Sequence, residues 1–270
     1  MPSDDFFRAH SGEIDSLTQK FQGFPDVNRT KIELWIQNFR DEHKELALKL
    51  LNNVDYFDTA RIYTACRDIF TQLKTLKGED LSNVYFCNFG NPANSGQHIL
   101  SIFAMANGLT GRANTPKFKQ ISELNELLLK PDITILFLDD FIGTGNQALN
   151  YWSGIASLVS SNAEIFLGAI CAFEEGIVNI QNNTEMKVLC HKRLNNTHKL
   201  LSTENNIFTS AEKVILQSYC NSTGAHLPQG YGNCQAIVVL SYRTPNNTVS
   251  ILTVQTDTWR GIFPRYSNNL

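Results

Sequence analysis

The sequence lacks three features that would place it in a membrane, nucleic-acid-binding or secreted class. No apolar run approaches the roughly 18 residues that a transmembrane helix needs, so we expect no membrane contact. Lys and Arg number 23 against 26 Asp and Glu, and the net charge of -3 argues against bulk electrostatic binding of nucleic acid. The first residues show no basic-then-apolar pattern of a secretory signal, so we expect a cytoplasmic protein.

Familiar catalytic and metal-binding motifs are missing as well. The six cysteines are scattered without C-x-x-C spacing, which argues against a zinc site or a thioredoxin-like motif. Cys87 and Cys171 stand in apolar runs, and we expect both to be buried thiols. The sequence contains no P-loop, no dinucleotide-binding fingerprint and no serine nucleophile elbow.

The chain does contain ample apolar material for a folded core. Hydrophobic residues make up 42% of it, with 17 Phe and 3 Trp, which predicts a globular protein. Apolar residues at helical spacing predict helices over residues 30–39, 45–52 and 59–73, with Asn28 or Thr30 capping the first. We therefore expect an N-terminal helical region over residues 1–78, either separate from residues 79–270 or integrated with them.

Beyond residue 78, strands and helices alternate, which is typical of an α/β fold with a parallel sheet. Strands are predicted at residues 84–87, 133–138, 165–173 and 186–190, and helices at residues 97–105, 121–129 and 147–159. Two more strand-like runs, at residues 235–242 and 249–254, flank a turn that contains Pro and Asn. These two runs predict a C-terminal β-hairpin.

The most informative segment is residues 133–147, where a buried strand delivers Asp139 and Asp140 and a short loop leads into a helix. Open parallel sheets bind ligands beyond the carboxyl ends of their strands. A glycine-bearing loop lets backbone N–H groups converge on a phosphate, and the following helix N-terminus adds a favourable dipole. Two carboxylates suit a pair of adjacent hydroxyls. Together these groups describe a site for a 5-phosphoribosyl unit.

This segment resembles the signature of type I phosphoribosyltransferases, which is a hydrophobic strand, two acids, two variable residues and then Thr-Thr-Gly-Gly-Thr. Thr144 and Gly145 are kept together with both acids. Gly143, Asn146 and Gln147 replace the first Thr, the second Gly and the last Thr. The resemblance implies that the backbone from Gly143 to Gln147 and the Thr144 hydroxyl hold the 5′-phosphate.

The same resemblance implies a catalytic and metal-binding role for the two acids. Asp139 and Asp140 would contact the ribose hydroxyls and, together with phosphoribosyl pyrophosphate, bind Mg²⁺. The implied reaction is displacement at C1 by a base or another amine, in which the protein positions the groups and stabilises the leaving pyrophosphate. Two other interpretations remain open: an ordinary strand-to-helix turn with a capped helix, and a metal-binding acidic pair of the response-regulator type.

A second loop, over residues 89–96, follows one predicted strand and precedes a helix. In the family, the loop after an earlier core strand cradles pyrophosphate, and Ser95 and Gly96 match that position. Anion binding at the following helix N-terminus is physically reasonable. An ordinary turn is the alternative.

The layout of the whole chain also resembles a phosphoribosyltransferase-like family of prokaryotic conflict and anti-phage systems, including retron operons. The matching parts are Asp139 to Gln147, Gly230 to Gly232, Thr244 to Thr248 and Trp259 to Arg265, within residues 32–265. The resemblance implies a type I phosphoribosyltransferase-like core with helices on both faces of its sheet. It also implies a defence effector with a protein or ribonucleoprotein partner, and we expect a homo-oligomer.

Other side chains have a functional and a structural interpretation side by side. Tyr231 would stack on a base or belong to a turn. Glu174 or Glu175 would accept a hydrogen bond from the base or hold Mg²⁺, or would favour a helix N-terminus. Candidates for a lid or for pyrophosphate contact, with a solvated surface as the alternative, are Arg112, Lys117, Lys119, His191, Lys192 and Arg193.

The sequence thus predicts a protein that binds phosphoribosyl pyrophosphate or a nucleotide. As an enzyme it would be a phosphoribosyltransferase, or would cleave the glycosidic bond of a nucleotide. The alternative is a non-catalytic sensor of ribose phosphates or nucleotides, which keeps the phosphate loop without turnover.

Overall fold

The computed structural model describes residues 2–90, 96–128, 130, 132–159 and 161–265 of the chain. Its contacts form two compact units: unit 1 comprises Met1–Ala60 and Asn196–Leu270, and unit 2 comprises Arg61–Asn195. This division differs from the boundary expected at residue 78. The helix α5 (Thr59–Lys77), which we expected in the N-terminal region, belongs almost entirely to unit 2.

Unit 2 contains a five-stranded sheet in the order β3-β2-β4-β5-β6, in which every neighbouring pair is parallel. The strands are β2 (Val84–Asn88), β3 (Phe118–Lys119), β4 (Thr134–Ile142), β5 (Glu164–Phe173) and β6 (Lys187–Leu194). Both β4 and β5 are apolar and buried over nearly their whole length, as central strands of a parallel sheet require. The predicted parallel α/β sheet is confirmed.

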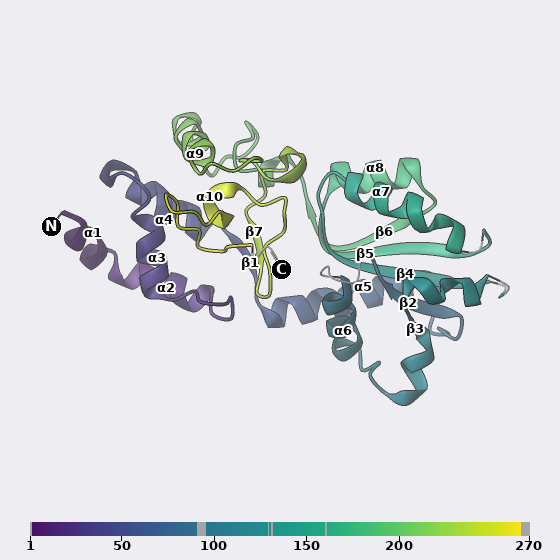
Figure 1. Ribbon diagram of the computed structural model, residues 1–270. Helices are drawn as coiled ribbons and strands as arrows, with labels where there is room; N and C mark the ends of the chain where they lie inside the picture. The colour runs from purple at the N-terminus through teal and green to yellow at the C-terminus, as the bar shows by residue number, and fades with distance from the viewer. Residues whose placement is uncertain (1, 91–95, 129, 131, 160, 266–270) are drawn as a thin grey trace. The chain divides into compact units, whose positions relative to one another are not determined.

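Helices cover both faces of this sheet, as expected (Figure 1). On one face, α5 and α6 (Gly96–Ala106) pack through a cluster of Phe70, Phe86 and Phe103 with ring centroids 5.3–6.1 Å apart. On the other face lie α7 (Asn146–Ile155) and α8 (Glu174–Asn183), with Trp152 of α7 against Phe137 of β4 at 5.9 Å. Short 3-10 segments complete the unit: η2 (Arg112–Lys117), η3 (Ile121–Leu127) and η4 (Ala156–Leu158).

The strand order reverses direction between β2 and β4. From β2 the chain moves outward to β3, whereas from β4 it moves the opposite way through β5 to β6. Open α/β sheets bind ligands at the carboxyl ends of the two strands where the order reverses. The loops that follow β2 and β4 both start at this edge.

Unit 1 builds its core from both ends of the chain. Its buried cluster joins N-terminal residues such as Trp35 to C-terminal ones such as Ile251 and Trp259. The Nε1 atoms of both tryptophans donate to the Ile251 carbonyl, at 2.7 and 3.0 Å. Its elements are α1 (Pro2–Ala9), α2 (Ser11–Lys20), α3 (Arg29–Ile36), η1 (Asp41–His43), α4 (Lys44–Asn52), β1 (Asp55–Phe57), η5 (Asn196–His198), α9 (Ser210–Ser222), η6 (Tyr231–Asn233), β7 (Val238–Leu240) and α10 (Ser250–Thr253).

Two local predictions in unit 1 have opposite outcomes. Asn28 caps α3, because its side chain accepts a hydrogen bond from the Lys31 amide at 2.9 Å. The expected C-terminal hairpin is wrong: β7 pairs in parallel with β1, and residues 250–253 form the helix α10. All four α10 residues are buried, and a short run that is buried on every side does not distinguish strand from helix by its pattern.

Candidate functional site

The two candidate acids lie inside β4 rather than after it. The strand continues through Asp139 and Asp140 to Ile142, four residues beyond the predicted end at Leu138. Asp139 is half-buried, and Asp140 is 5% exposed. The Asp139 carboxylate accepts a hydrogen bond from the Asp140 amide at 2.8 Å. Both carboxylates are thus held at the carboxyl end of a central strand.

The loop after β4 turns sharply into α7. Gly145 has φ +81°, a left-handed conformation that residues with a side chain rarely adopt. Asn146 begins the helix, and its amide lies 3.4 Å from the Thr144 hydroxyl. Asn146 and Gln147 are exposed at the first turn, where the amides and the helix dipole favour an anion. The structure therefore brings together Asp139, Asp140 and the entire predicted phosphate loop.

Helix α8 holds this loop in place through backbone contact, which the sequence analysis did not predict. A Cβ on Gly176 would lie 2.0 Å from the Gly143 carbonyl oxygen, and one on Gly145 would lie 2.7 Å from the Gly176 oxygen. The Asn179 side-chain amide donates to the Thr144 carbonyl at 2.8 Å and to the Asn146 side chain at 3.0 Å. The available signal was a glycine in the first turn of the helix that follows the neighbouring strand.

The loop after β2 starts beside the same site. The Phe89 amide donates to the Leu138 carbonyl at 2.9 Å, which aligns the ends of β2 and β4. The Gly90 carbonyl accepts from Tyr151 of α7 at 2.9 Å and from the Asn88 side chain at 3.2 Å. Burial raises the pKa of the Tyr151 phenol, with Cys87 adding to the effect, so this phenol stays protonated as a donor.

The two residues expected to hold pyrophosphate are only partly described. Ser95 lies outside the described residues, whereas Gly96 is the first residue of α6. Because α6 follows β2, its N-terminus lies on the same side of the sheet as the N-termini of α7 and α8. Three helix N-termini thus follow the carboxyl ends of adjacent strands.

A family model named PRTase-CE matches residues 32–265, which is most of the chain. The chain belongs to the PRTase-CE family. The predicted resemblance to type I phosphoribosyltransferases is thereby confirmed, and the matched range coincides with the one expected from the sequence. No curated protein matches the chain in a sequence search.

Three solved structures are similar at low sequence identity. The AQ2163 protein from Aquifex aeolicus is 11% identical, covering 62% of this chain and 83% of its own, with a TM-score of 0.36. A hypoxanthine-guanine-xanthine phosphoribosyltransferase is 13% identical over 53% of this chain and 79% of its own, with a TM-score of 0.33. An orotate phosphoribosyltransferase from Aeropyrum pernix is 12% identical over 48% of this chain and 70% of its own, with a TM-score of 0.30. Membership of the PRTase-CE family rests on the sequence model.

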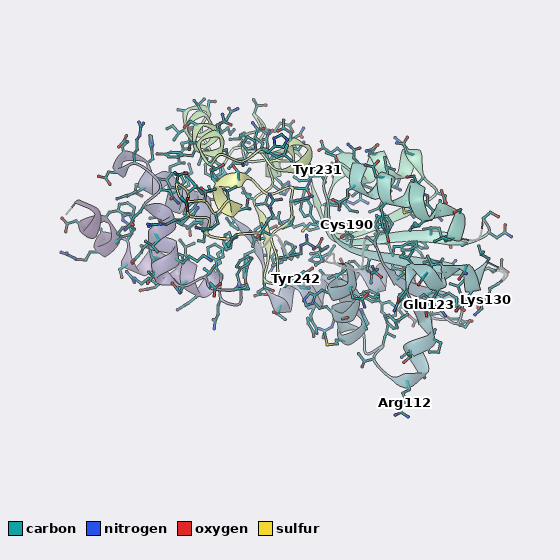
Figure 2. All side chains as sticks on the ribbon, in the orientation of Figure 1. Arg112, Glu123, Lys130, Cys190, Tyr231 and Tyr242 are labelled. Carbon is teal, nitrogen blue, oxygen red and sulfur yellow. The ribbon has the colours of Figure 1, made fainter. Side chains whose placement is uncertain are left out.

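Two of the three lid candidates of this PRTase-CE chain, Lys117 and Lys119, have other partners, and the third, Arg112, points into solvent. Lys117 donates to the Leu81 carbonyl at 2.6 Å, before the amino end of β2 and away from the carboxyl edge. Lys119 pairs with Glu126 at 2.8 Å, and this hydrogen bond raises its pKa. Arg112 is exposed at the outer end of η2, pointing into solvent (Figure 2).

The remaining candidates divide between the two units. Glu174 and Glu175 are exposed in the first turn of α8, directly after β5. Tyr231 lies in η6 of unit 1. His191, on β6, contacts Asp68 of α5 with its Nδ1 atom 2.9 Å from the carboxylate.

The cysteines of this PRTase-CE chain are not arranged for nucleophilic or redox chemistry. All six are described, and all are buried, including Cys87 and Cys171 as predicted. Burial raises the pKa of the Cys66, Cys87 and Cys190 thiols to about 12, so they are neutral at physiological pH. No helix in the described residues is long and apolar enough to cross a membrane.

Proposed function

We propose that this chain binds a 5-phosphoribosyl ligand, either phosphoribosyl pyrophosphate or a nucleotide, at Asp139 to Gln147. The observation that carries the proposal is the position of this segment at the reversal of strand order between β2 and β4. Sheets of this kind bind ligands there. The loop amides and the Thr144 hydroxyl would hold the 5′-phosphate, and Asp139 and Asp140 would accept from the ribose hydroxyls.

The rigidity of the loop supports this assignment. Gly176 and Asn179 fix the loop backbone before any ligand arrives, so little conformational entropy is lost on binding. Gly143 and Gly145 are buried against α8, while Asn146 and Gln147 are exposed at the helix start. A phosphate would therefore meet amides that are already oriented.

The donor set at this site suits Mg²⁺ bound together with phosphate oxygens. The described residues contain no group of three or more His, Cys, Asp or Glu side chains that would hold an ion alone. Asp139 and Asp140 supply two carboxylates, and Mg²⁺ is commonly bound by one or two carboxylates plus water and substrate phosphates. When bound, Mg²⁺ would neutralise charge on a departing pyrophosphate.

The decisive experiment is calorimetric titration of phosphoribosyl pyrophosphate with Mg²⁺ into the wild type and the Asp139→Asn/Asp140→Asn variant. We expect binding in the wild type and at least about a hundredfold loss in the variant, because each bidentate or charge-assisted contact is worth about 1.5–3 kcal/mol. Ribose 5-phosphate, titrated in parallel, should bind to the wild type through the same loop. A folded wild type that binds neither ligand would refute the proposal.

Pyrophosphate release distinguishes an enzyme from a sensor. An enzyme would release pyrophosphate from the bound ligand, with a base, an amine or water as the nucleophile. A sensor would bind with the same dependence on Asp139 and Asp140 and would release none. Ser95 and Gly96 belong to the enzyme alternative, since they would hold the pyrophosphate before and after cleavage.

The resemblance to conflict-system proteins supports a second layer of the proposal, an effector in anti-phage or retron defence with a protein or ribonucleoprotein partner. A cytoplasmic location and a homo-oligomer belong to the same layer. Expression of the chain alone should then slow bacterial growth, and Asp139→Asn/Asp140→Asn should relieve the effect. Toxicity that persists in the double variant would show that the phosphate loop is not its source.

A further inference from the structure

One side chain of α7 holds the point where the chain leaves β2. Tyr151 lies in the second turn of α7, and its phenol donates to the Gly90 carbonyl at 2.9 Å. Its ring packs edge-on against Phe89, with the ring centroids 5.0 Å apart. A single side chain thus contacts both of the residues that directly follow β2.

The Gly90 carbonyl is held from both faces of the sheet. The Asn88 side chain, which is buried, also donates to it, at 3.2 Å. Phe86 packs against Phe103 of α6, and side chains alternate along a strand, so Asn88 belongs to the α6 face. Tyr151 comes from α7, which covers the opposite face (Figure 1). Two donors from opposite faces leave this carbonyl little freedom to turn.

The backbone of Gly90 depends on such contacts. Its φ is +104°, in a region that residues with a side chain rarely adopt. Glycine is the conformationally freest residue, so this conformation is one of many open to it unless contacts select it. Because the peptide group is planar, holding the Gly90 oxygen also fixes the direction in which the chain leaves β2. Tyr151 and Asn88 therefore select one direction at this point.

The helix that carries Tyr151 also carries part of the phosphoribosyl site. It begins at Asn146, where the first-turn amides are those proposed to meet the 5′-phosphate. Tyr151 follows five residues later, about 7.5 Å along the helix axis. The loop whose start it holds leads to Gly96, the first residue of α6. One helix therefore joins the phosphate loop to the start of the loop expected to meet pyrophosphate.

We propose that Tyr151 is a positioning residue for pyrophosphate: by holding Gly90 it aligns the start of the loop after β2 with the phosphate loop. The site then prefers a pentose that carries phosphate groups at both C1 and C5 over one phosphorylated at C5 alone. This inference rests on the proposed function and deepens it. Tyr151 acts through Gly90 and does not itself touch the ligand. A loop start that is fixed before binding loses less conformational entropy when pyrophosphate arrives.

The test compares Tyr151→Phe with Tyr85→Phe. Tyr151→Phe keeps the ring against Phe89 and removes only the donor to Gly90. Tyr85→Phe is the matched control, since the Tyr85 phenol accepts from Lys130 at 2.8 Å near the amino end of β2, away from both loops. Calorimetry with Mg²⁺ measures the affinity of each protein for phosphoribosyl pyrophosphate, pyrophosphate and ribose 5-phosphate.

We expect the wild type to bind phosphoribosyl pyrophosphate at least about tenfold more tightly than ribose 5-phosphate, because the pyrophosphate adds charge-assisted contacts. Tyr151→Phe should weaken binding of phosphoribosyl pyrophosphate and of pyrophosphate by about tenfold, the scale of one lost hydrogen bond. Its affinity for ribose 5-phosphate should stay within about twofold of the wild-type value. Tyr85→Phe should bind all three probes like the wild type. Both variants lose one phenol hydrogen bond, so only the position of that bond accounts for the difference.

Four results would overturn the inference, and the last would also refute the proposed function. If Tyr151→Phe weakens ribose 5-phosphate as much as phosphoribosyl pyrophosphate, Tyr151 supports the fold and does not position pyrophosphate. If Tyr151→Phe binds all three probes like the wild type, the bond to Gly90 has no part in binding. If the wild type binds phosphoribosyl pyrophosphate no more tightly than ribose 5-phosphate, this inference alone fails. If the wild type binds none of the probes, the proposed function fails with it.

Discussion

The two units of this chain build their buried cores from differently arranged parts of the sequence. Unit 2 is one continuous stretch, Arg61–Asn195, in which β2, β4 and β5 are each followed along the chain by a helix that packs on the sheet. Unit 1 joins two segments separated by that stretch, and its parallel pair brings Tyr56 beside Val239. The contrast shows that a local sequence pattern predicts structure well where packing partners are near in sequence. Unit 2, which contains the candidate site, is of this kind.

The largest effect should come from two glycines, one in each unit, that touch backbone. A Cβ at Gly176 would lie 2.0 Å from the Gly143 oxygen, and one at Gly230 would lie 2.2 Å from the Asn247 oxygen. Gly230 in addition has a φ of +78°, which residues with a side chain rarely adopt. Each alanine substitution should cost about 3 kcal/mol in the free energy of unfolding of its own unit. Gly176→Ala should abolish ligand binding, whereas Gly230→Ala should leave the phosphate loop intact.

Hydrogen exchange measured by mass spectrometry separates these two effects, since peptides from residues 61–195 and from the two ends report on different units. Gly154→Ala in α7 is the matched control, because a Cβ there meets nothing within 4 Å. Alanine is a better helix former than glycine by about 1 kcal/mol, so this control should be neutral or slightly stabilising. Equal exchange changes in both units after Gly176→Ala would contradict the expectation that this substitution destabilises only unit 2.

The next effect concerns Asn179, the side chain that holds the phosphate loop from α8. Asn179→Ala removes hydrogen bonds of 2.8 and 3.0 Å to Thr144 and Asn146. We expect a loss of about 1–2 kcal/mol in stability and about a tenfold weaker affinity for phosphoribosyl pyrophosphate, because the loop is no longer fixed before binding. Urea denaturation and calorimetry measure the two quantities.

Asn182→Ala serves as the control for this variant, since Asn182 is an exposed residue of the same type on the same helix. It should leave both stability and affinity near the wild-type values. An Asn179→Ala protein with unchanged affinity would show that the loop does not depend on α8.

The sequence predicted features that depend on neighbouring residues and missed those that depend on contacts distant in the sequence. The strand-acid-acid-glycine order of residues 133–147 pointed to the candidate site, because backbone chemistry and strand position are encoded locally. Asn179 and Gly176 escaped prediction since their importance comes from a helix that follows the neighbouring strand. The hairpin expected at residues 235–254 failed for a stronger reason: β7 pairs with β1, whose partner residues lie about 180 positions earlier.

The capping box of α9 provides a smaller test, confined to unit 1. Thr209 accepts from the Glu212 amide at 3.2 Å, and its own amide donates to the Glu212 carboxylate at 2.7 Å. Thr209→Ala should cost about 1 kcal/mol in the free energy of unfolding. Urea denaturation should show this loss together with an unchanged affinity for phosphoribosyl pyrophosphate; weaker binding would mean that unit 1 influences the site.

The smallest effect is a pH-dependent ion pair at the amino edge of the sheet in unit 2, opposite the site. Glu164, the first residue of β5, accepts from Lys187 of β6 at 2.6 Å and from Lys77 of α5. The hydrogen bond from Lys187, followed by that from Lys77, lowers the pKa of the Glu164 carboxyl. A lowered pKa means that the stabilisation is present above the unfolded value of about 4.3 and is lost as pH falls through the folded value.

Glu164→Gln should therefore destabilise unit 2 at pH 7, by no more than about 1 kcal/mol because the group is partly exposed and screened. The difference from the wild type should shrink as the pH falls through the lowered folded pKa of Glu164, so it should be smaller at pH 3 than at pH 7. Urea denaturation at the two pH values measures it. Since the pair lies at the opposite edge from Asp139, ligand affinity at pH 7 should not change; a change would show that the phosphate loop responds to the amino ends of β5 and β6.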